Sequence, residues 1–125
     1  MIDHISVAVR DLQASTRFYE AVLGALGMVR LETRPATVGF GKIYAEFWIN
    51  LRQELSPVPA DSGAHVCFRA RSTELVDAFH AAALAAGGQS DGAPALRPQH
   101  GEGYYAAFIR DLDGNRIEAV TFVKA

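Results

Sequence analysis

Alternating apolar and polar residues at 2–9 predict a half-buried strand, with His4 on its more polar face. Apolar residues then recur at helical spacing over 12–26, after an N-capping residue, Asp11, and before a glycine stop at Gly27. Three short β-type segments follow at residues 28–33, 37–40 and 45–51. The first half of the chain is therefore predicted to form one β-α-β-β-β unit.

The same order of elements restarts after a proline-containing linker at residues 56–63. An alternating segment at 65–70 is followed by a helix that Ser72 is expected to cap. An offset of 61 relates five positions of the two halves: His4 to His65, Asp11 to Ser72, Phe18 to Phe79, Leu23 to Leu84 and Gly27 to Gly88. These matches cover strand, cap, apolar stripe and stop, so they indicate an internal repeat. We predict a single domain built from two such units, at residues 1–55 and 64–125.

The second unit departs from the repeat after its helix. Residues 89–103 contain prolines and glycines and are interpreted as an enlarged loop, which is a common position for ligand contacts. Two β-type runs then flank Asp113 and Gly114, at 104–110 and 116–122. Because glycine tolerates a positive φ, Asp-Gly between two such runs predicts a hairpin closed by a tight primed turn.

Strand parity decides which side chains face away from the helices. Each first strand buries its apolar face under a helix, which places His4 and His65 on the opposite face. The final strands of the units are related by an offset of 70, and there Trp48 and Glu118 share that same face. The predicted fold class is α+β, with two repeated βαβββ units forming a mixed, curved eight-stranded sheet around a cleft.

This strand parity places three possible metal ligands on the face that lines the predicted cleft. Two imidazoles, His4 and His65, and one carboxylate, Glu118, form the facial triad favoured by Fe(II), with Mn(II), Ni(II), Co(II) or Zn(II) as other options. A single histidine on a strand is usually a hydrogen-bonded structural residue, and the chain has no short-range metal motif. The matching positions of the two histidines in a repeat, with a carboxylate in register, favour a metal site.

Composition narrows the classes of protein. The chain has 125 residues, half of them hydrophobic, a formal net charge of −2 and one cysteine, Cys67. These values predict one domain without an internal disulfide, and they disfavour nucleic acid or a membrane surface as a partner. With no charged leader after Met1 and no apolar run near the roughly 20 residues that span a bilayer, a cytoplasmic location is expected.

Several segments together resemble one known family. They are residues 2–7 (IDHISV), 18–19 (FY), 23–24 (LG), 64–68 (AHVCF) and 111–118 (DLDGNRIE). The arrangement resembles the vicinal oxygen chelate superfamily, which includes glyoxalase I, extradiol dioxygenases, epimerases, and fosfomycin- and bleomycin-resistance proteins. The closing motif, D-x-D-G-N-x-I-E, resembles the family's usual D-P-D-G-N-x-I-E, with Leu112 in place of the proline.

The resemblance implies metal ligands at His4, His65 and Glu118 and a homodimer. Glyoxalase I has a fourth protein ligand at a position that register assigns to Trp48, and this departure argues against an ordinary lactoylglutathione lyase. Extradiol dioxygenases use two histidines and one glutamate, which fits better, although they are usually larger. The additional residues that handle protons in such enzymes have three tentative counterparts here, namely His100, Tyr104 and Tyr105.

Other roles stay open. Trp48 is either an aromatic wall for a substrate or a plug of the cleft, and Arg69 and Arg116 either bind a substrate carboxylate or are solvated. His100 is either a general base or an exposed loop residue. Two functions follow: a divalent-metal-dependent lyase, isomerase or extradiol-type dioxygenase that acts on a small molecule through two neighbouring oxygens, or a metal-free drug-binding protein of the bleomycin-resistance kind.

Overall fold

The structure is a computed structural model that describes residues 1–124; Ala125, the last residue of the predicted second unit, lies outside the described residues. The first unit contains β1 (Ile5–Val9), α1 (Leu12–Gly24), β2 (Val29–Thr33), β3 (Thr37–Gly41) and β4 (Phe47–Leu51). The second contains β5 (Val66–Arg69), α2 (Thr73–Ala85), β6 (Gln89–Leu96), the 3₁₀ helix η1 (Pro98–His100), β7 (Tyr104–Arg110) and β8 (Arg116–Phe122). Neither helix is long and apolar enough to cross a membrane in this part of the chain.

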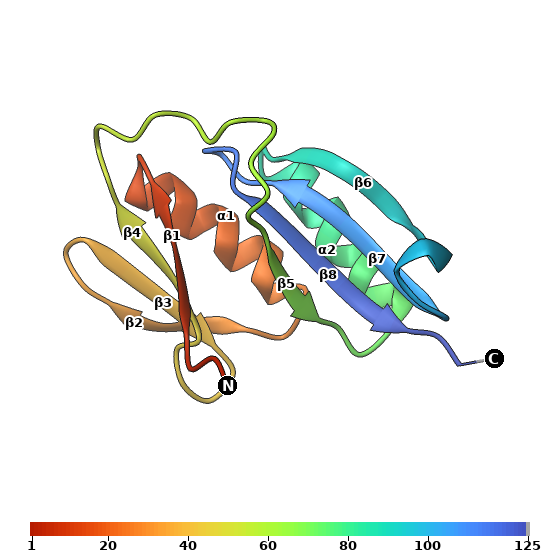
Figure 1. Cartoon of the computed structure of the whole chain (residues 1–125). Coiled ribbons are helices and arrows are strands. Elements are labelled where there is room, and N and C mark those ends of the chain that lie inside the picture. The colour runs from red at the N-terminus through yellow and green to blue at the C-terminus, as the bar shows by residue number, and fades with distance from the viewer. Residues whose placement is uncertain (125) are drawn as a thin grey trace.

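The eight strands form two four-stranded sheets, ordered β1-β4-β3-β2 and β5-β8-β7-β6 (Figure 1). In each sheet the first strand pairs in parallel with the last strand of its unit, and the other pairs are antiparallel. No ladder joins β1 to β5 within residues 1–124, so the α+β fold has two open mixed sheets, not one continuous eight-stranded sheet. Each helix covers one face of its own sheet, and α1 contacts α2.

Helix capping confirms the repeat. Asp11 Oδ1 accepts a hydrogen bond from the Ala14 amide at 3.0 Å, and Ser72 Oγ accepts one from the Leu75 amide at 3.3 Å. The helices run from residue 12 to 24 and from residue 73 to 85, so both ends differ by 61. Local capping and the apolar stripe therefore determine the same helix at the same place in each unit.

One hydrophobic core runs through both units. Its largest fully buried apolar side chains are Tyr19, Phe18, Phe40, Phe47, Phe79, Leu23, Ile49, Ile109 and Ile117. The rings of Phe47 in β4 and Phe68 in β5 lie 5.3 Å apart in a T-shaped pair, which joins the two halves of the core. The helix-facing side of each sheet is thereby committed to packing, and the opposite side is left for chemistry.

The prediction of a loop over 89–103 is wrong for its first half, because residues 89–96 form strand β6. This strand lies at the edge of the sheet and its pairing with β7 shifts register on both sides of Gly92. An edge strand with bulges tolerates Pro94, which lacks an amide donor, and the weak strand propensity of Asp91. These residues conceal the strand from a pattern-based prediction.

The predicted hairpin of β7 and β8 is present, but the connection between them is not the tight primed turn expected from Asp113 and Gly114. Residues 111–115 form a five-residue connection in which Gly114 adopts a φ of 91°. The Asp111 side chain organises it, since its Oδ1 accepts hydrogen bonds from the amides of Asp113 at 2.9 Å and Asn115 at 2.8 Å. Glycine is needed here for its positive φ, as predicted, but a carboxylate shapes the turn.

The same connection holds the two units together, and we call its contacts the inter-unit latch. Asp111 Oδ2 accepts hydrogen bonds from Tyr19 Oη at 2.6 Å and Asn115 Nδ2 at 2.9 Å. Asn115 Nδ2 also donates to a backbone carbonyl of β1 at 2.9 Å. Asp113 Oδ1 accepts from the amide and from Nε of Arg10, both at 3.1 Å. The D-x-D-G-N part of the closing motif is therefore structural in this chain.

The latch predicts a stability change at alkaline pH. Burial and the neighbouring Asp111 carboxylate raise the pKa of Tyr19 well above its ordinary value of 10.0. As the pH rises past 10.0, the Tyr19 phenol loses its proton in the unfolded state but keeps it in the folded state. The unfolded state then binds fewer protons, so the free energy of unfolding falls. In urea unfolding between about pH 8 and pH 11, we expect Tyr19→Phe to show a smaller decline in unfolding free energy than the wild type. An identical decline in both proteins contradicts this assignment.

Candidate functional site

The face of the second sheet opposite α2 carries a cluster of polar and aromatic side chains. Alternation along β5, β7 and β8 places these residues on it: His65, Cys67, Arg69, Tyr104, Phe108, Arg116, Glu118 and Phe122. In the strand register, Glu118 lies beside Cys67 on one side and Phe108 on the other. Glu118 therefore lies in the inner strand β8, with neighbours from both adjacent strands, β5 and β7.

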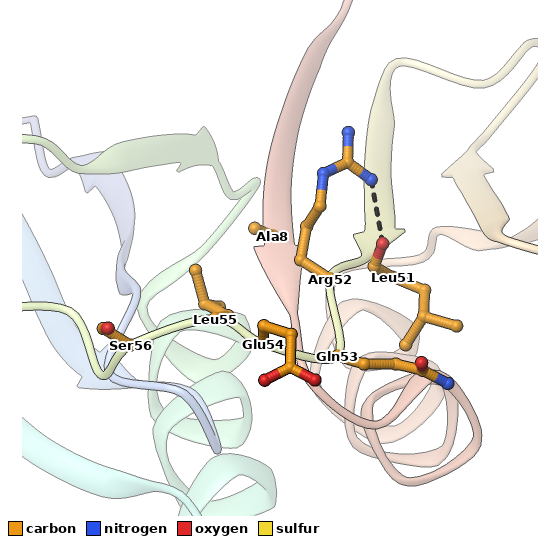
Figure 2. Close-up of a pocket in the computed structure, with 7 residues that line it drawn as sticks. All are labelled: Ala8, Leu51, Arg52, Gln53, Glu54, Leu55 and Ser56. Atoms are coloured by element: carbon orange, nitrogen blue, oxygen red, sulfur yellow. Dashed lines mark hydrogen bonds between the residues drawn. The ribbon is translucent and has the colours of Figure 1, made fainter.

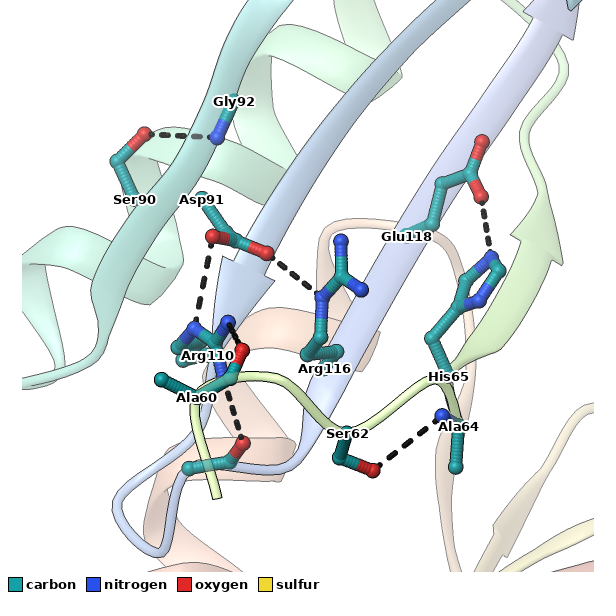
Figure 3. Close-up of polar contacts among 11 residues, drawn as sticks. Ala60, Ser62, Ala64, His65, Ser90, Asp91, Gly92, Arg110, Arg116 and Glu118 are labelled. Carbon is teal, nitrogen blue, oxygen red and sulfur yellow. Dashed lines mark hydrogen bonds and ion pairs between the residues drawn. The ribbon is translucent and has the colours of Figure 1, made fainter. Parts of the chain in front are cut away.

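Glu118 is the centre of this cluster. Its side chain is only 2% exposed, and its Oε1 lies 2.9 Å from His65 Nε2 (Figure 3). Its other oxygen, Oε2, accepts a short hydrogen bond from Tyr104 Oη. Sequence reasoning placed His65 and Glu118 on one face, and the structure brings these two side chains into contact.

Two neighbours of Glu118, Tyr104 and Cys67, keep their protons near neutral pH. Burial and the hydrogen bond to Glu118 raise the pKa of Tyr104, and burial with the Glu118 charge raises the pKa of Cys67 to about 12. Tyr104 is therefore a phenol that donates to the carboxylate, and Cys67 is a neutral thiol with little nucleophilic character. The Glu118 carboxylate is therefore the acceptor on which the side chains of this cluster converge.

His4 and Trp48 lie on the first unit. They line one hollow of about 350 Å³ with Asp3, Ser6, Arg34, Thr37, Ala45 and Asn50. His4 Nδ1 is 2.8 Å from Asp3 Oδ2, and the Arg34 guanidinium stacks 4.8 Å from the Trp48 ring centroid. Trp48 thus lines a hollow of the first unit, and Glu118 is not among the residues of that hollow.

His4 stands apart from the His65–Glu118 pair. Over residues 1–124, no three His, Cys, Asp or Glu side chains lie close enough together to hold a metal ion. Strands β1 and β5 line a common small pocket and run in opposite directions (Figure 1). The residues that precede them, His4 and His65, therefore lie toward opposite ends of the pair. The repeat relates the two histidines by symmetry without bringing them together within this part of the chain.

The three residues considered for proton transfer do not all lie on the face that carries Glu118. The His100 ring lies 5.3 Å from that of Tyr104, so it borders the cluster. Tyr105 faces α2 instead, and its hydroxyl donates to Asp77 at 2.6 Å. Neighbouring residues on a strand point to opposite faces, so only Tyr104 of the two tyrosines reaches Glu118. Tyr105 has a packing role in this structure.

Arg116 in β8 is held by an acidic residue of the edge strand β6, across the intervening β7. Its Nε donates to Asp91 Oδ2 at 2.8 Å, and Asp91 also pairs with Arg110 at 3.5 Å (Figure 3). The guanidinium of Arg110 further donates to the carbonyl of Ala60 at 3.1 Å, which ties the linker to the second sheet. Arg116, one of the two arginines considered for a substrate carboxylate, therefore has an anionic partner within the chain.

Sequence reasoning missed two aromatic residues and one arginine on this face. Phe108 and Phe122 have the same strand parity as Tyr104 and Glu118, so parity alone could have identified them. Arg97 stacks 5.1 Å from the Phe108 ring centroid, but it lies in the segment interpreted as a loop. Arg97 directly follows β6, and no strand pattern in that segment indicated which face it would join.

A hollow larger than that of His4 and Trp48 lies elsewhere. It has a volume of about 880 Å³ and is lined by Ala8, Leu51, Arg52, Gln53, Glu54, Leu55 and Ser56 (Figure 2). The Arg52 guanidinium folds back to donate to the Leu51 carbonyl at 2.8 Å. This open hollow, where the linker leaves β4, contains none of the predicted site residues. Size alone therefore does not identify the functional site.

Comparison with known proteins identifies the superfamily to which this chain belongs. Residues 1–119 match the family model of the Glyoxalase/Bleomycin resistance protein/Dioxygenase superfamily, and the chain belongs to this superfamily. The duplicated βαβββ architecture is therefore the vicinal oxygen chelate fold that the closing motif indicated.

The chain is similar to particular members of known sequence or structure. A glyoxalase/bleomycin resistance protein from Albidiferax ferrireducens T118 has 35% sequence identity and a TM-score of 0.84, covering 96% of this chain and 98% of its own. Virulence protein STM3117 of Salmonella typhimurium is 33% identical, over 98% of this chain and 84% of its own. The fosfomycin resistance protein FosX from Listeria monocytogenes has a TM-score of 0.72 over 98% of this chain and 93% of its own; at 19% identity it shows the fold alone.

Proposed function

We propose that this chain is a divalent-metal-dependent enzyme that acts on a small molecule through two neighbouring oxygens, by lyase, isomerase or extradiol-type dioxygenase chemistry. In this proposal His65 and Glu118 are the central metal ligands. The observation that carries it is the 2.9 Å separation of His65 Nε2 and the buried Glu118 Oε1 on the face of the second sheet opposite α2. Superfamily membership supports the same reading, because metal-dependent enzymes are among its members.

The donor set fits a divalent ion. His65 Nε2 and Glu118 Oε1 lie 2.9 Å apart, at hydrogen-bond distance, so one ion could contact both atoms if it took the place of that hydrogen bond. A cation beside the buried Glu118 carboxylate would also offset the cost of its burial, in addition to the contacts from His65 and Tyr104. One imidazole and one carboxylate suit Fe(II), Mn(II), Ni(II), Co(II) or Zn(II).

His4 is proposed as the third ligand, supplied by a second copy of the chain. Its Nδ1 is bound to Asp3, which leaves Nε2 for coordination, and a carboxylate on the other ring nitrogen is typical of metal-binding histidines. Because His4 does not join the pair within residues 1–124, the open face of the first unit needs the second unit of another copy. A twofold homodimer would form two such sites.

The surrounding residues have definite tasks in this proposal. A bound ion would polarise a substrate oxygen and so make a neighbouring proton easier to remove. Tyr104 stays protonated and holds one oxygen of Glu118, which orients the carboxylate. His100, packed against Tyr104, is placed to exchange protons at the rim of the site. Phe108 and Phe122 lie on the same face and would give a bound substrate apolar contact surface.

A subunit-mixing experiment tests this arrangement. His4→Ala and His65→Ala are each expected to lose stoichiometric metal, measured by elemental analysis after gel filtration. When the two variants are unfolded and refolded together, about a quarter of the sites should regain metal, because one site in each mixed dimer has both histidines.

Either of two results contradicts the arrangement. Full metal content in both separate variants rules out these ligands. Loss in each variant without recovery on mixing places His4 and His65 of one chain at one site and rules out the second copy. The exposed His100, replaced by Ala, is the matched control and should keep its metal.

A further inference from the structure

Two guanidinium groups stack on aromatic rings of the face that carries Glu118. Arg69 Cζ lies 4.6 Å from the Phe122 ring centroid, and Arg97 Cζ lies 5.1 Å from that of Phe108. Phe108 pairs directly with Glu118 in the β7–β8 ladder. The aromatic and cationic groups are therefore immediate neighbours of the proposed metal ligands.

Phe122 links Arg69 to the Glu118 centre. The Phe122 ring makes a T-shaped contact with Tyr104 at 5.5 Å, and Tyr104 donates to Glu118. Arg69 also follows Cys67, the strand neighbour of Glu118, by two residues on the same face. Two residues along a strand span about 6.6 Å, which is roughly the length of a substituted benzene ring.

The positive charges of these two arginines are not balanced within the chain. Over residues 1–124, neither Arg69 nor Arg97 has a carboxylate within 4.0 Å, whereas Arg110 and Arg116 share Asp91. Arg97 uses two of its groups on backbone carbonyls, at 2.6 Å and 3.3 Å. Arg69 makes neither an ion pair nor a side-chain hydrogen bond in the same part of the chain, so its fork of donors is available to a ligand.

Stacking on Phe122 holds the Arg69 guanidinium in an orientation that suits anion binding. A guanidinium held over an aromatic ring keeps its plane and its edge donors, and this arrangement suits bidentate binding of a carboxylate or another planar oxyanion. Phe122 is 45% exposed, so its ring also offers an apolar surface to a ligand. A flat ligand body can lie against Phe108 and Phe122 between the cation and the carboxylate.

We propose that the substrate is a planar or aromatic compound with an acidic group, which Arg69 binds while two neighbouring oxygens lie at His65 and Glu118. This inference rests on the proposed function for the position of the reacting oxygens. It adds the chemical class of substrate and one specificity-determining residue. Arg97 contributes positive charge to the same face but is already tethered to the backbone.

Two matched probes test this proposal, namely 3,4-dihydroxybenzoate and its methyl ester. Both carry the same neighbouring oxygens, and only the acid carries the anion. Isothermal titration of the zinc-loaded wild type should give a dissociation constant for the acid about tenfold below that for the ester. Arg69→Gln should abolish this preference and Arg69→Lys should keep part of it, because lysine keeps the charge without the fork. Arg71→Gln, an exposed arginine on another surface, is the control and should keep the full preference.

Three results overturn the proposal: no binding of the acid to the wild type, equal binding of acid and ester, or an unchanged preference in Arg69→Gln. The Glu118→Gln variant separates this proposal from the proposed function. If both probes bind that variant as tightly as the wild type while the preference still depends on Arg69, the metal-centred function fails and the anion subsite stands. If Glu118→Gln weakens both probes equally and preserves the ratio, both proposals are supported.

Discussion

Glu118→Gln is expected to lower the affinity for divalent metal by more than about 100-fold. Loss of an outer-shell partner of a metal ligand already costs 10- to 100-fold, and this change removes a ligand charge itself. Glutamine keeps the size of the side chain, and its carbonyl oxygen can still accept the hydrogen bond from Tyr104. The neutral amide also relieves the chain of a buried carboxylate, so stability should not fall with affinity.

The measurement is a competition titration of the refolded protein against a fluorescent chelator, with Zn(II) and Mn(II) in separate series. Glu102→Gln is the matched control, because Glu102 is an exposed glutamate in the segment that leads into β7. Its affinity should equal that of the wild type. Wild-type affinity in Glu118→Gln, or an equal loss in both variants, would show that the buried carboxylate does not bind metal.

Asp111→Ala is expected to remove about 3–5 kcal/mol from the free energy of unfolding. Its carboxylate accepts hydrogen bonds from Tyr19 Oη, from Asn115 Nδ2 and from the amides of Asp113 and Asn115. Each buried donor left without an acceptor costs about 1–3 kcal/mol, and partial rearrangement reduces the sum. Because these donors come from α1 and from the β7–β8 connection, the loss weakens the contact between the two units.

Urea unfolding monitored by circular dichroism measures this effect. Asp61→Ala is the control, because Asp61 is an exposed aspartate of the linker, and its unfolding free energy should stay within about 0.5 kcal/mol of the wild type. A change below about 1 kcal/mol in Asp111→Ala would mean that the latch is not a major source of stability.

Local signals in the sequence predicted most of the fold because the elements that carry them are regular. Caps at Asp11 and Ser72 and the apolar stripes between cap and glycine determine both helices. The strands of the final hairpin, 104–110 and 116–122, match the prediction at both ends because period-two alternation is strong there. Strand β6 was missed because an edge strand with Pro94 lacks that pattern and depends on tertiary pairing.

The part of the candidate site that lies within one sheet could be predicted from strand parity. Parity placed His65 and Glu118 on one face, and the β5–β8 register brought them into contact. It would also have separated Tyr104 from Tyr105, had it been applied to β7. The relation of His4 to this pair depends instead on how two sheets without a shared ladder pack together, and no local pattern encodes that packing.

Anomalous diffraction from crystals grown with Mn(II) or Zn(II) tests most directly whether His65 and Glu118 hold a metal ion. We predict one strong anomalous peak per chain within coordination distance of His65 Nε2 and of a Glu118 carboxylate oxygen, with His4 of a second copy as the third protein ligand. The two side chains would then contact the ion in place of their present 2.9 Å contact with each other. Ordered His65 and Glu118 that keep that direct contact, with no peak beside them at saturating metal, would contradict the proposed metal centre.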